Sequence, residues 1–317
     1  MSASPTRPEA LWLVALAGAL VVPALAWAPY SQVLLNMAVI NAINTVALYV
    51  LFGLTGILSV AQAAFWAIGA YTSAILTVDG HLPVWLGFVA APAAAGLAGA
   101  ALALPTLGLR SHYLTIATIG FAEVTRLVLV NWEPVTRGPS GISGIPAPSL
   151  GGLSLAPYRL YYYLGLALLV LVAVAVERLR RSRLGRGLEA VRDDELAAES
   201  SGIPAARLKV LAFSVSALLS GLAGALYAHL QRYVSPDAFT LDHTMQMLAM
   251  LMVGGRRSLG GAIAGAVLLT YLPEALRGLQ DWYMAIYGGG LLAILVFLPG
   301  GLAGAAARVR VRRGRPA

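Results

Sequence analysis

The stretch GLEAVRDDELAAESSGIP, at residues 187–204, carries five carboxylates. It stands between two strongly apolar runs, LYYYLGLALLVLVAVAV (160–176) and VLAFSVSALLSGLAGALYAHL (210–230). A helix needs about 20 apolar residues to cross a bilayer, and each run is close to that length. The contrast predicts a membrane protein that holds one charged, water-exposed segment between two of its spans.

The composition extends this interpretation to the whole chain. Of its 317 residues, 59% are hydrophobic and only 11% are charged, whereas soluble domains average about 25% charged residues. We therefore expect an all-α polytopic membrane protein, with one transmembrane domain over 1–317. About ten spans are expected, at 10–28, 32–51, 55–78, 84–104, 111–131, 159–176, 210–230, 243–255, 259–274 and 283–300.

Two parts of this span pattern leave alternatives open. The run at 10–28 resembles a signal peptide with an A-x-A site, but its length favours an uncleaved first span. The runs at 243–255 and 259–274 are short, so they are either two spans or one re-entrant hairpin.

The uneven placement of basic residues predicts the orientation. The net charge is +8, and basic residues are concentrated in 177–209 and in the tail at 301–317. Basic loops stay on the cytoplasmic side, so both termini and 177–209 are expected to be cytoplasmic. A basic tail beside a bilayer points to anionic lipid as a partner, not to nucleic acid. The Pro- and Gly-rich loop at 131–158 then lies outside, as a docking surface or a simple connection.

Several kinds of chemistry are disfavoured by residue types. A nucleotide-binding P-loop needs a lysine after its glycines, and the single lysine, Lys209, follows no such loop. The chain has no cysteine, and its four histidines show no metal-ligand spacing. They lie near predicted span ends, where a half-hydrated imidazole needs no functional explanation. We therefore predict no enzymatic activity, no metal and no cofactor.

Polar residues recur at steps of three and four in two predicted spans. The third span carries the stripe Ser59, Gln62, Trp66, Gly69 and Ser73, and the fifth carries Thr115 and Thr118. Polar stripes in a membrane face the bundle interior or a water-filled path. A mildly polar path would suit a neutral or zwitterionic solute, and hydrogen bonding between helices explains the stripes equally well.

Glu123 and Arg126 lie well inside the fifth predicted span, at a spacing that allows them to pair. They form either a neutralised structural pair or a substrate or proton site, so Glu123 joins the candidate path residues. An ion-coupled secondary carrier that uses Glu123 is the alternative class of function.

The charged segment at 177–209 carries signals for two short helices. Leu184, Leu188 and Val191 have helical spacing, and Asp193 or Asp194 can cap a second helix. Gly202 supplies its C-terminal stop. These helices would present a defined shape to a cytoplasmic partner.

At this point the chain resembles a known family, the LivM-type permease subunits of branched-chain amino acid ABC transporters. The resemblance covers roughly residues 40–300. Five stretches carry it: GILSVAQAAFWAIGAYTSAIL (56–76), LRSHYLTIATIGFAEVTRLV (109–128), NWEPVTRGPSGI (131–142), GRGLEAVRDDELAAESSGIPAARLKVLAFSVSALLSGLAGALYA (185–228) and MLMVGGRRSLGGAIAGAVLLTYLPEALR (250–277).

The resemblance implies a division of labour in a bacterial cytoplasmic (inner) membrane. The partners would be a second permease subunit, two cytoplasmic ATP-binding subunits and a periplasmic or lipid-anchored solute-binding protein. The substrate would be a branched-chain amino acid, although relatives also carry urea and short amides.

In this family a cytoplasmic coupling helix with the pattern EAA-x-x-x-G inserts into the ATPase. Leu196 stands here at the first position of that pattern, with Glu195 beside it. The implied ATPase-coupling residues are Glu189, Arg192, Asp193, Asp194, Glu195, Leu196, Ala197, Ala198, Gly202 and Ile203.

Overall fold

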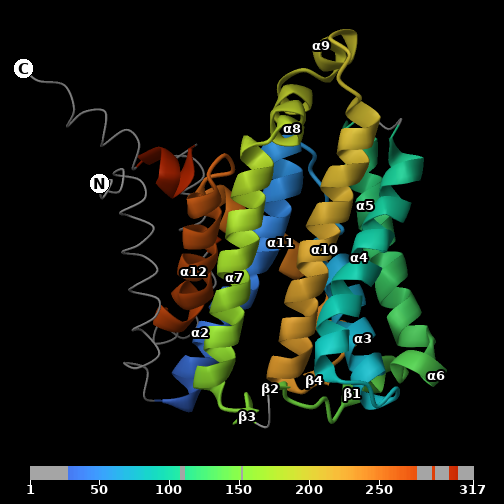
Figure 1. Ribbon diagram of the computed structural model, residues 1–317, viewed down its shortest axis with the longest axis vertical. Helices are drawn as coiled ribbons and strands as arrows, with labels where there is room; N and C mark the ends of the chain where they lie inside the picture. The colour runs from blue at the N-terminus through green and yellow to red at the C-terminus, as the bar shows by residue number, and fades with distance from the viewer. Residues whose placement is uncertain (1–27, 108–110, 151–152, 277–287, 290–299, 306–317) are drawn as a thin grey trace, which may run out of the picture.

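The computed structural model describes residues 28–107, 111–150, 153–276, 288–289 and 300–305, which form a helical bundle (Figure 1). The predicted spans at 10–28 and 283–300 lie almost entirely outside these residues. The helices are α2 (Pro29–Leu48) with its π-helical extension η1 (Tyr49–Gly53), α3 (Gln62–Val78), α4 (Val84–Thr106), α5 (Ser111–Asn131), α6 (Glu133–Thr136), α7 (Tyr158–Arg181), α8 (Arg183–Asp193), α9 (Glu195–Ser200), α10 (Ala205–Gln231), α11 (Leu241–Gly254) and α12 (Leu259–Ala275).

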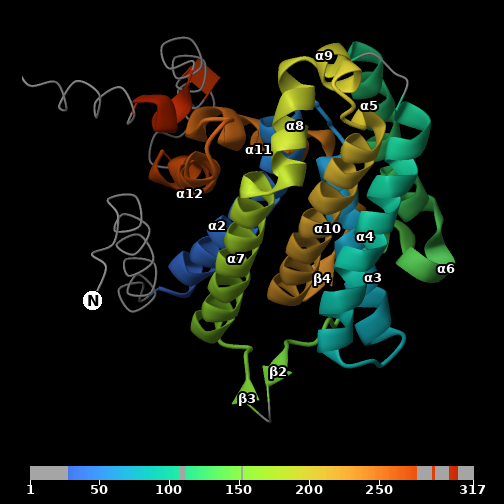
Figure 2. The same cartoon turned by 45° about the horizontal axis from the view of Figure 1, so that its top comes forward.

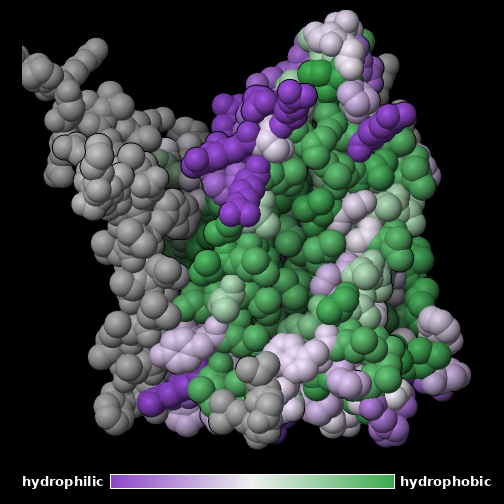
Figure 3. All heavy atoms as spheres, in the orientation of Figure 1, coloured by the Kyte–Doolittle hydropathy of each residue, from purple (hydrophilic) through white to green (hydrophobic). Residues whose placement is uncertain are grey.

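Five helices among the described residues are long and apolar enough to cross a membrane: α2 with η1, α4, α5, α7 and α10. Helices α3 and α12 are apolar but shorter, with 17 residues each. Large apolar side chains point outward from the bundle, such as Val89 and Leu97 of α4, which are 71% and 73% exposed. Such an apolar exterior, visible in Figure 3, is stable only against lipid. The chain is therefore a multi-pass membrane protein.

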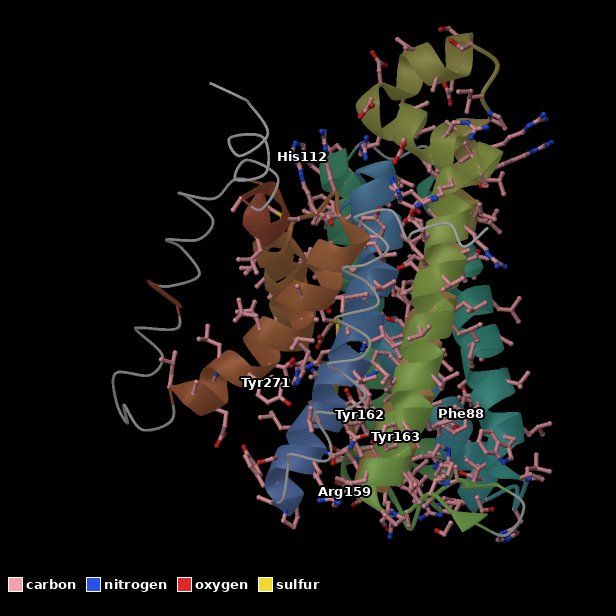
Figure 4. The ribbon with its side chains drawn as sticks, turned by 60° about the vertical axis from the view of Figure 1, so that its left-hand side comes forward. Phe88, His112, Arg159, Tyr162, Tyr163 and Tyr271 are labelled. Atoms are coloured by element: carbon pink, nitrogen blue, oxygen red, sulfur yellow. The ribbon has the colours of Figure 1, made fainter. Side chains whose placement is uncertain are left out.

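The two ends of the bundle differ in chemistry. Helices α8 and α9 lie at one end, where hydrophilic residues gather on the surface (Figures 1 and 3); we call this the charged end. Short strands lie at the other, the strand end. Figure 4 shows His112, near the start of α5, at the charged end, and Arg159, near the start of α7, at the strand end. Thus α7 runs toward α8 and α9, and α10 returns from them.

Helix α10 is the central element, packed against α2, α3 and α4 (Figure 2). Small residues allow this close packing. A Cβ atom placed on Gly69 of α3 would lie 2.3 Å from the carbonyl oxygen of Gly221 of α10. One placed on Gly221 would lie 2.5 Å from the Cβ atom of Ala95 of α4. Close backbone approach of this kind gives van der Waals contact where lipid supplies no hydrophobic drive.

The predicted span at 55–78 is wrong at its start, because residues 56–61 are not helical. Gly56 has φ +73°, which ends the preceding helix in the left-handed region that glycine tolerates. Helix α3 begins only at Gln62. Hydropathy missed this break because residues 57–61 are apolar or small and most of them are buried.

The region 243–274 forms two helices, α11 and α12, joined by a turn at 255–258. Gly255 has φ +113° in this turn. Two glycines of α12, four residues apart, pack against α11: a Cβ atom on Gly261 would lie 2.3 Å from the Gly254 carbonyl oxygen, and one on Gly265 would lie 2.1 Å from that of Met250. The two helices therefore form a tight antiparallel pair.

The strand end contains the structured loop that follows α5. Its elements are η2 (Gly138–Ser140), β1 (Ile142–Ser143), β2 (Ser149–Leu150) and β3 (Leu153–Ser154), and the later elements β4 (Tyr233–Val234) and η3 (Pro236–Ala238) pack nearby. Antiparallel pairs form between β1 and β4 and between β2 and β3. These two-residue strands are a small departure from the all-α prediction. They give hydrogen-bonding partners to loop backbone that has no helix to join.

Candidate functional site

The charged segment folds as two capped helices, as its sequence predicts. The Ser182 hydroxyl accepts a hydrogen bond from the Gly185 N–H at 3.2 Å and caps α8. Leu188 and Val191 are buried beneath α8, whereas Leu184 is 48% exposed. Two of the three residues with helical spacing therefore anchor α8 to the bundle.

Helix α9 is capped at both ends. The Asp194 carboxylate accepts a hydrogen bond from the Ala197 N–H at 3.0 Å, which selects Asp194 over Asp193 as the cap. At the other end Gly202 has φ +80°, and the Ile203 N–H donates to the Ala198 carbonyl at 3.0 Å. These bonds satisfy the terminal backbone groups of a six-residue helix, so α9 keeps a fixed shape.

The faces of α9 differ sharply in exposure. Ala198 is 4% exposed and packs inward, whereas Leu196 is 78% exposed. Ala197, Glu199 and Ser200 are exposed beside Leu196. Lys209 of α10, almost fully buried, forms an ion pair with Glu195, which ties α9 to the central helix. Helix α9 thus exposes the apolar side chain of Leu196, while Ala198 and the ion pair between Glu195 and Lys209 attach the helix to the bundle.

The remaining predicted coupling residues lie along α8. Asp193 is exposed, and Glu189 is partly exposed. Arg192 points inward: its Nη1 donates to the Gly53 carbonyl at 3.0 Å, and its Nε pairs with Asp193 at 3.0 Å. The segment therefore brings the predicted residues together, with Arg192 directed toward the end of η1.

The polar stripe of α3 faces α10. Gln62 Nε2 donates to the Ser220 hydroxyl at 2.7 Å, and the Ser73 hydroxyl is hydrogen-bonded to His229 Nε2 at 2.8 Å. Gly69 lies between them against α10. This is the geometry of hydrogen bonding between helices, and a role in the substrate path stays a prediction.

Ser59 and Trp66 occupy different surroundings. Ser59 lies in the non-helical break, where its hydroxyl accepts the Ala61 N–H at 3.3 Å. Trp66 lies in an aromatic cluster, with its ring centroid 4.7 Å from that of Tyr227 and 4.9 Å from that of Phe239. Both Ser59 and Trp66 are at most 1% exposed.

The threonines of α5 bind the backbone of the break. Thr118 Oγ1 accepts the Val60 N–H at 3.0 Å, and the Thr115 hydroxyl donates to the Leu58 carbonyl at 3.1 Å. Non-helical backbone inside a membrane protein needs such partners because lipid offers none. The stripe in the fifth span is visible in the sequence, but its backbone partners are not.

Two further sets of residues were missed at the sequence level. A polar network joins α2 and α10 at mid-height, where the Ser220 hydroxyl donates to Asn44 Oδ1 at 2.6 Å. His229 is only 1% exposed, in contrast to the half-hydrated state expected near a span end. Its Nδ1 lies 2.7 Å from the Pro146 carbonyl, which holds the loop of the strand end against α10. The stripe on α3 was the signal for both sets, because it required polar partners.

The predicted pair on α5 forms, and it faces outward. Arg126 Nη2 lies 2.6 Å from Glu123 Oε1, with the two side chains 32% and 53% exposed. The same face carries exposed Ile116, Val124 and Leu127. Ionisable pairs inside membrane spans face the bundle interior, a partner or a water-filled path, or reach toward the interface. A role of Glu123 in the substrate path stays a prediction. Among the described residues, no cluster of His, Asp or Glu could hold a metal ion.

Comparisons with known proteins identify the family. Residues 30–296 match the family of permease components of branched-chain amino acid transport systems. The high-affinity branched-chain amino acid transport system permease protein LivM of Salmonella typhimurium is 36% identical over 312 residues, covering 90% of this chain and 73% of the relative. LivM of Escherichia coli K12 is 35% identical over 325 residues, covering 94% and 75%.

A more distant relative is the autoinducer 2 import system permease protein LsrC of an Enterobacter species, 33% identical over 224 residues, which cover 68% of this chain and 63% of the relative. No solved structure matches the chain. The family match spans most of the sequence, including the break at 56–61 that precedes α3 and the α8–α9 segment. The chain belongs to the family of permease components of branched-chain amino acid transport systems.

Proposed function

We propose that the chain is the membrane-spanning permease subunit of an ATP-driven importer of branched-chain amino acids in a bacterial inner membrane. Family membership supports the permease role, and the names of the LivM relatives support the substrate. The single lysine lies outside any P-loop pattern, so ATP hydrolysis is assigned to separate subunits.

The exposed leucine at the tip of α9 carries the proposal of ATPase docking. Leu196 is 78% exposed, yet its neighbours Asp194, Glu195 and Glu199 are acidic and belong in water. Contact with lipid therefore does not explain its exposure, whereas a groove on a cytoplasmic protein does. A central apolar side chain ringed by polar ones is the arrangement of an interface anchor.

The mounting of α9 suits a helix that transmits force. The Asp194 cap fixes the start of α9, and the ion pair between Glu195 and Lys209 connects α9 to α10. Helix α10 in turn packs on α2, α3 and α4 at the centre of the bundle. A displacement of α9 by a partner would therefore reach most of the described spans.

The charged end is assigned to the cytoplasm. The last turn of α7 and the length of α8 hold arginines, among them Arg178, Arg181 and Arg186, and Arg256 follows α11 at the same end. Positive charge is retained on the cytoplasmic side. The ten spans predicted from the sequence, with both termini on the cytoplasmic side, agree with this orientation. The ordered loop of the strand end then faces the solute-binding protein.

The outward face of α5 is assigned to the second permease subunit. Its pair of Glu123 and Arg126 is half-exposed at membrane depth, and Gly120 beside it leaves open space, since a Cβ atom there would meet nothing within 4 Å. A related subunit packed on this face would shield the charges from lipid. A substrate path between two such faces would place Glu123 and Arg126 at its wall.

The docking proposal is tested by placing a charge at the tip of α9. Leu196→Arg is expected to remove the ATPase subunits that co-purify with the chain and to lower uptake of labelled leucine by at least about tenfold, as for other interface anchors. Leu184→Arg is the matched control, because it makes the same change at an exposed leucine of α8 and should leave both close to wild type. Retention of ATPase subunits and uptake by Leu196→Arg would disprove the docking role.

A further inference from the structure

The end of the first described span leaves backbone carbonyls without helical partners, as every helix end does. One of them, the Gly53 carbonyl, accepts a hydrogen bond from Arg192 Nη1 at 3.0 Å. Arg192 lies 139 residues later in the sequence, on α8. A single side chain therefore joins the charged segment to the helix that precedes the break at 56–61. A positive charge at a helix C-terminus also complements the helix dipole.

The side chain of Arg192 is held over the break itself. A Cβ atom on Gly56 would lie 2.9 Å from Arg192 Cγ, so the apolar stem of Arg192 covers the left-handed glycine. The pair with Asp193 orients the guanidinium group, and the Arg192 side chain is only 18% exposed. Its geometry is fixed at both the stem and the head.

The far side of the break is bonded to α5. Thr115 holds the Leu58 carbonyl and Thr118 holds the Val60 N–H. Helix α5 carries the outward pair of Glu123 and Arg126. The break is therefore a short non-helical connection between Arg192 on one side and, on the other, the inward side of α5, the helix whose outward face is assigned to the substrate path.

We propose that Arg192 is a positioning residue that transmits movement of the α8–α9 segment to the break at 56–61, and through it to α3 and α5. This inference rests on the proposed function, because an ATPase partner must move α9. Non-helical backbone is the element that can change shape here, since its bonds are to hydroxyl groups and not to a regular helical ladder. Arg192 would then act inside the permease, not at the surface that the ATPase touches.

Arg186 supplies a matched control on the same helix. Its Nη1 also donates to a backbone carbonyl at 3.0 Å, but that carbonyl belongs to Arg181, within the same charged segment. Arg186→Ala removes the same charge and the same kind of bond without touching the break. A difference between the two alanine variants therefore reports the contacts that only Arg192 makes, those with Gly53, Gly56 and Asp193.

The first experiment separates docking from transmission. Arg192→Ala is expected to retain co-purified ATPase subunits and their ATP hydrolysis, while uptake of labelled leucine per ATP hydrolysed falls by about tenfold or more. Arg192→Lys should recover part of the uptake, and Arg186→Ala should behave as wild type. Uptake by Arg192→Ala close to wild type, or a parallel loss of ATPase subunits and uptake, would overturn the proposal. If wild type itself retains no ATPase subunit, the proposed function fails instead.

The second experiment follows the break directly, using the fact that the chain has no cysteine. Ser59→Cys places a thiol at a position that is 0% exposed, and Ser200→Cys places one at an exposed position of α9. During ATP turnover, the thiol at position 59 is expected to become reactive to a maleimide, and Arg192→Ala should abolish that change. The thiol at position 200 should react throughout. Labelling at position 59 that is the same with and without Arg192 would refute the transmission role.

Discussion

The Val60 backbone N–H donates a hydrogen bond to the Thr118 hydroxyl at 3.0 Å, so a side chain of α5 completes the backbone of the break that precedes α3. Both groups are buried, Val60 at 2% and Thr118 at 0% exposure. A non-helical segment can persist inside the membrane part of a protein only when side chains take over its backbone bonds. The polar stripe of α5 therefore has a structural task that its sequence alone did not reveal.

Loss of the Thr118 hydroxyl should destabilise the chain. Thr118→Val keeps the side-chain shape but leaves the Val60 N–H buried without a partner, at a cost of about 1–3 kcal/mol. The midpoint of thermal unfolding of the purified chain in detergent should fall. Thr118→Ser retains the hydroxyl and should remain near wild type. Equal midpoints for the valine and serine variants would contradict this account of the break.

Added volume at the crossing of α3 and α10 should also destabilise the bundle. Gly69→Ala would bring a methyl group within 2.3 Å of the Gly221 carbonyl oxygen, and the forced separation of the helices should cost about 1–3 kcal/mol. Gly120→Ala is the control, because its Cβ atom meets no neighbour. The midpoint of thermal unfolding of the isolated chain should be lower for Gly69→Ala than for Gly120→Ala. Similar midpoints would show that the crossing is not tightly packed.

Loss of the carboxylate from the ion pair between α9 and α10 should destabilise the attachment of α9, whereas loss of an exposed carboxylate of the same helix should not. Glu195→Gln leaves the ammonium group of Lys209, almost fully buried, without its carboxylate. The partial exposure of Glu195 reduces the loss to about 1–2 kcal/mol. Glu199→Gln removes an exposed carboxylate of the same helix and should have little effect. Protease cleavage within 194–204 should become faster only for Glu195→Gln, and equal cleavage rates would argue against the pair as the mount of α9.

Variants of the ion pair between Glu123 and Arg126 on α5 distinguish a role in the subunit interface from a role in ion coupling. Glu123→Gln should leave Arg126 uncompensated and lower the yield of complex with the second permease subunit. The double variant Glu123→Arg with Arg126→Glu should restore much of the yield of complex, because it keeps the ion pair with its charges reversed. If the exchanged variant assembles normally but loses uptake, Glu123 acts in transport itself. If the single variant assembles normally, the face of α5 is not the interface.

Sequence patterns predicted some of these features because their causes are local. The cap at Asp194 and the stop at Gly202 depend on residues a few positions apart, and both are found. The helices α4, α5, α7 and α10 follow from continuous apolar runs. The pair of Glu123 and Arg126 follows from helical spacing within one span.

Other features depend on contacts between distant parts of the chain. The break at 56–61 was hidden because hydropathy does not distinguish a buried helix from buried irregular backbone. The contact between Arg192 and Gly53 joins positions 139 residues apart. The burial of His229 depends on the loop carbonyl of Pro146, which no periodicity encodes. Such partners become visible only once the helices are packed.

The central claim is ATP-driven uptake of branched-chain amino acids. The most direct measurement is uptake of labelled leucine, isoleucine and valine by native cells with and without this gene, in the presence of an ionophore that collapses ion gradients but spares ATP. The account predicts uptake that requires the gene and survives the ionophore. Gene-dependent uptake that the ionophore abolishes would contradict it and indicate an ion-coupled carrier. No gene-dependent uptake of the three amino acids would contradict the assigned substrate and direct the search to urea and short amides.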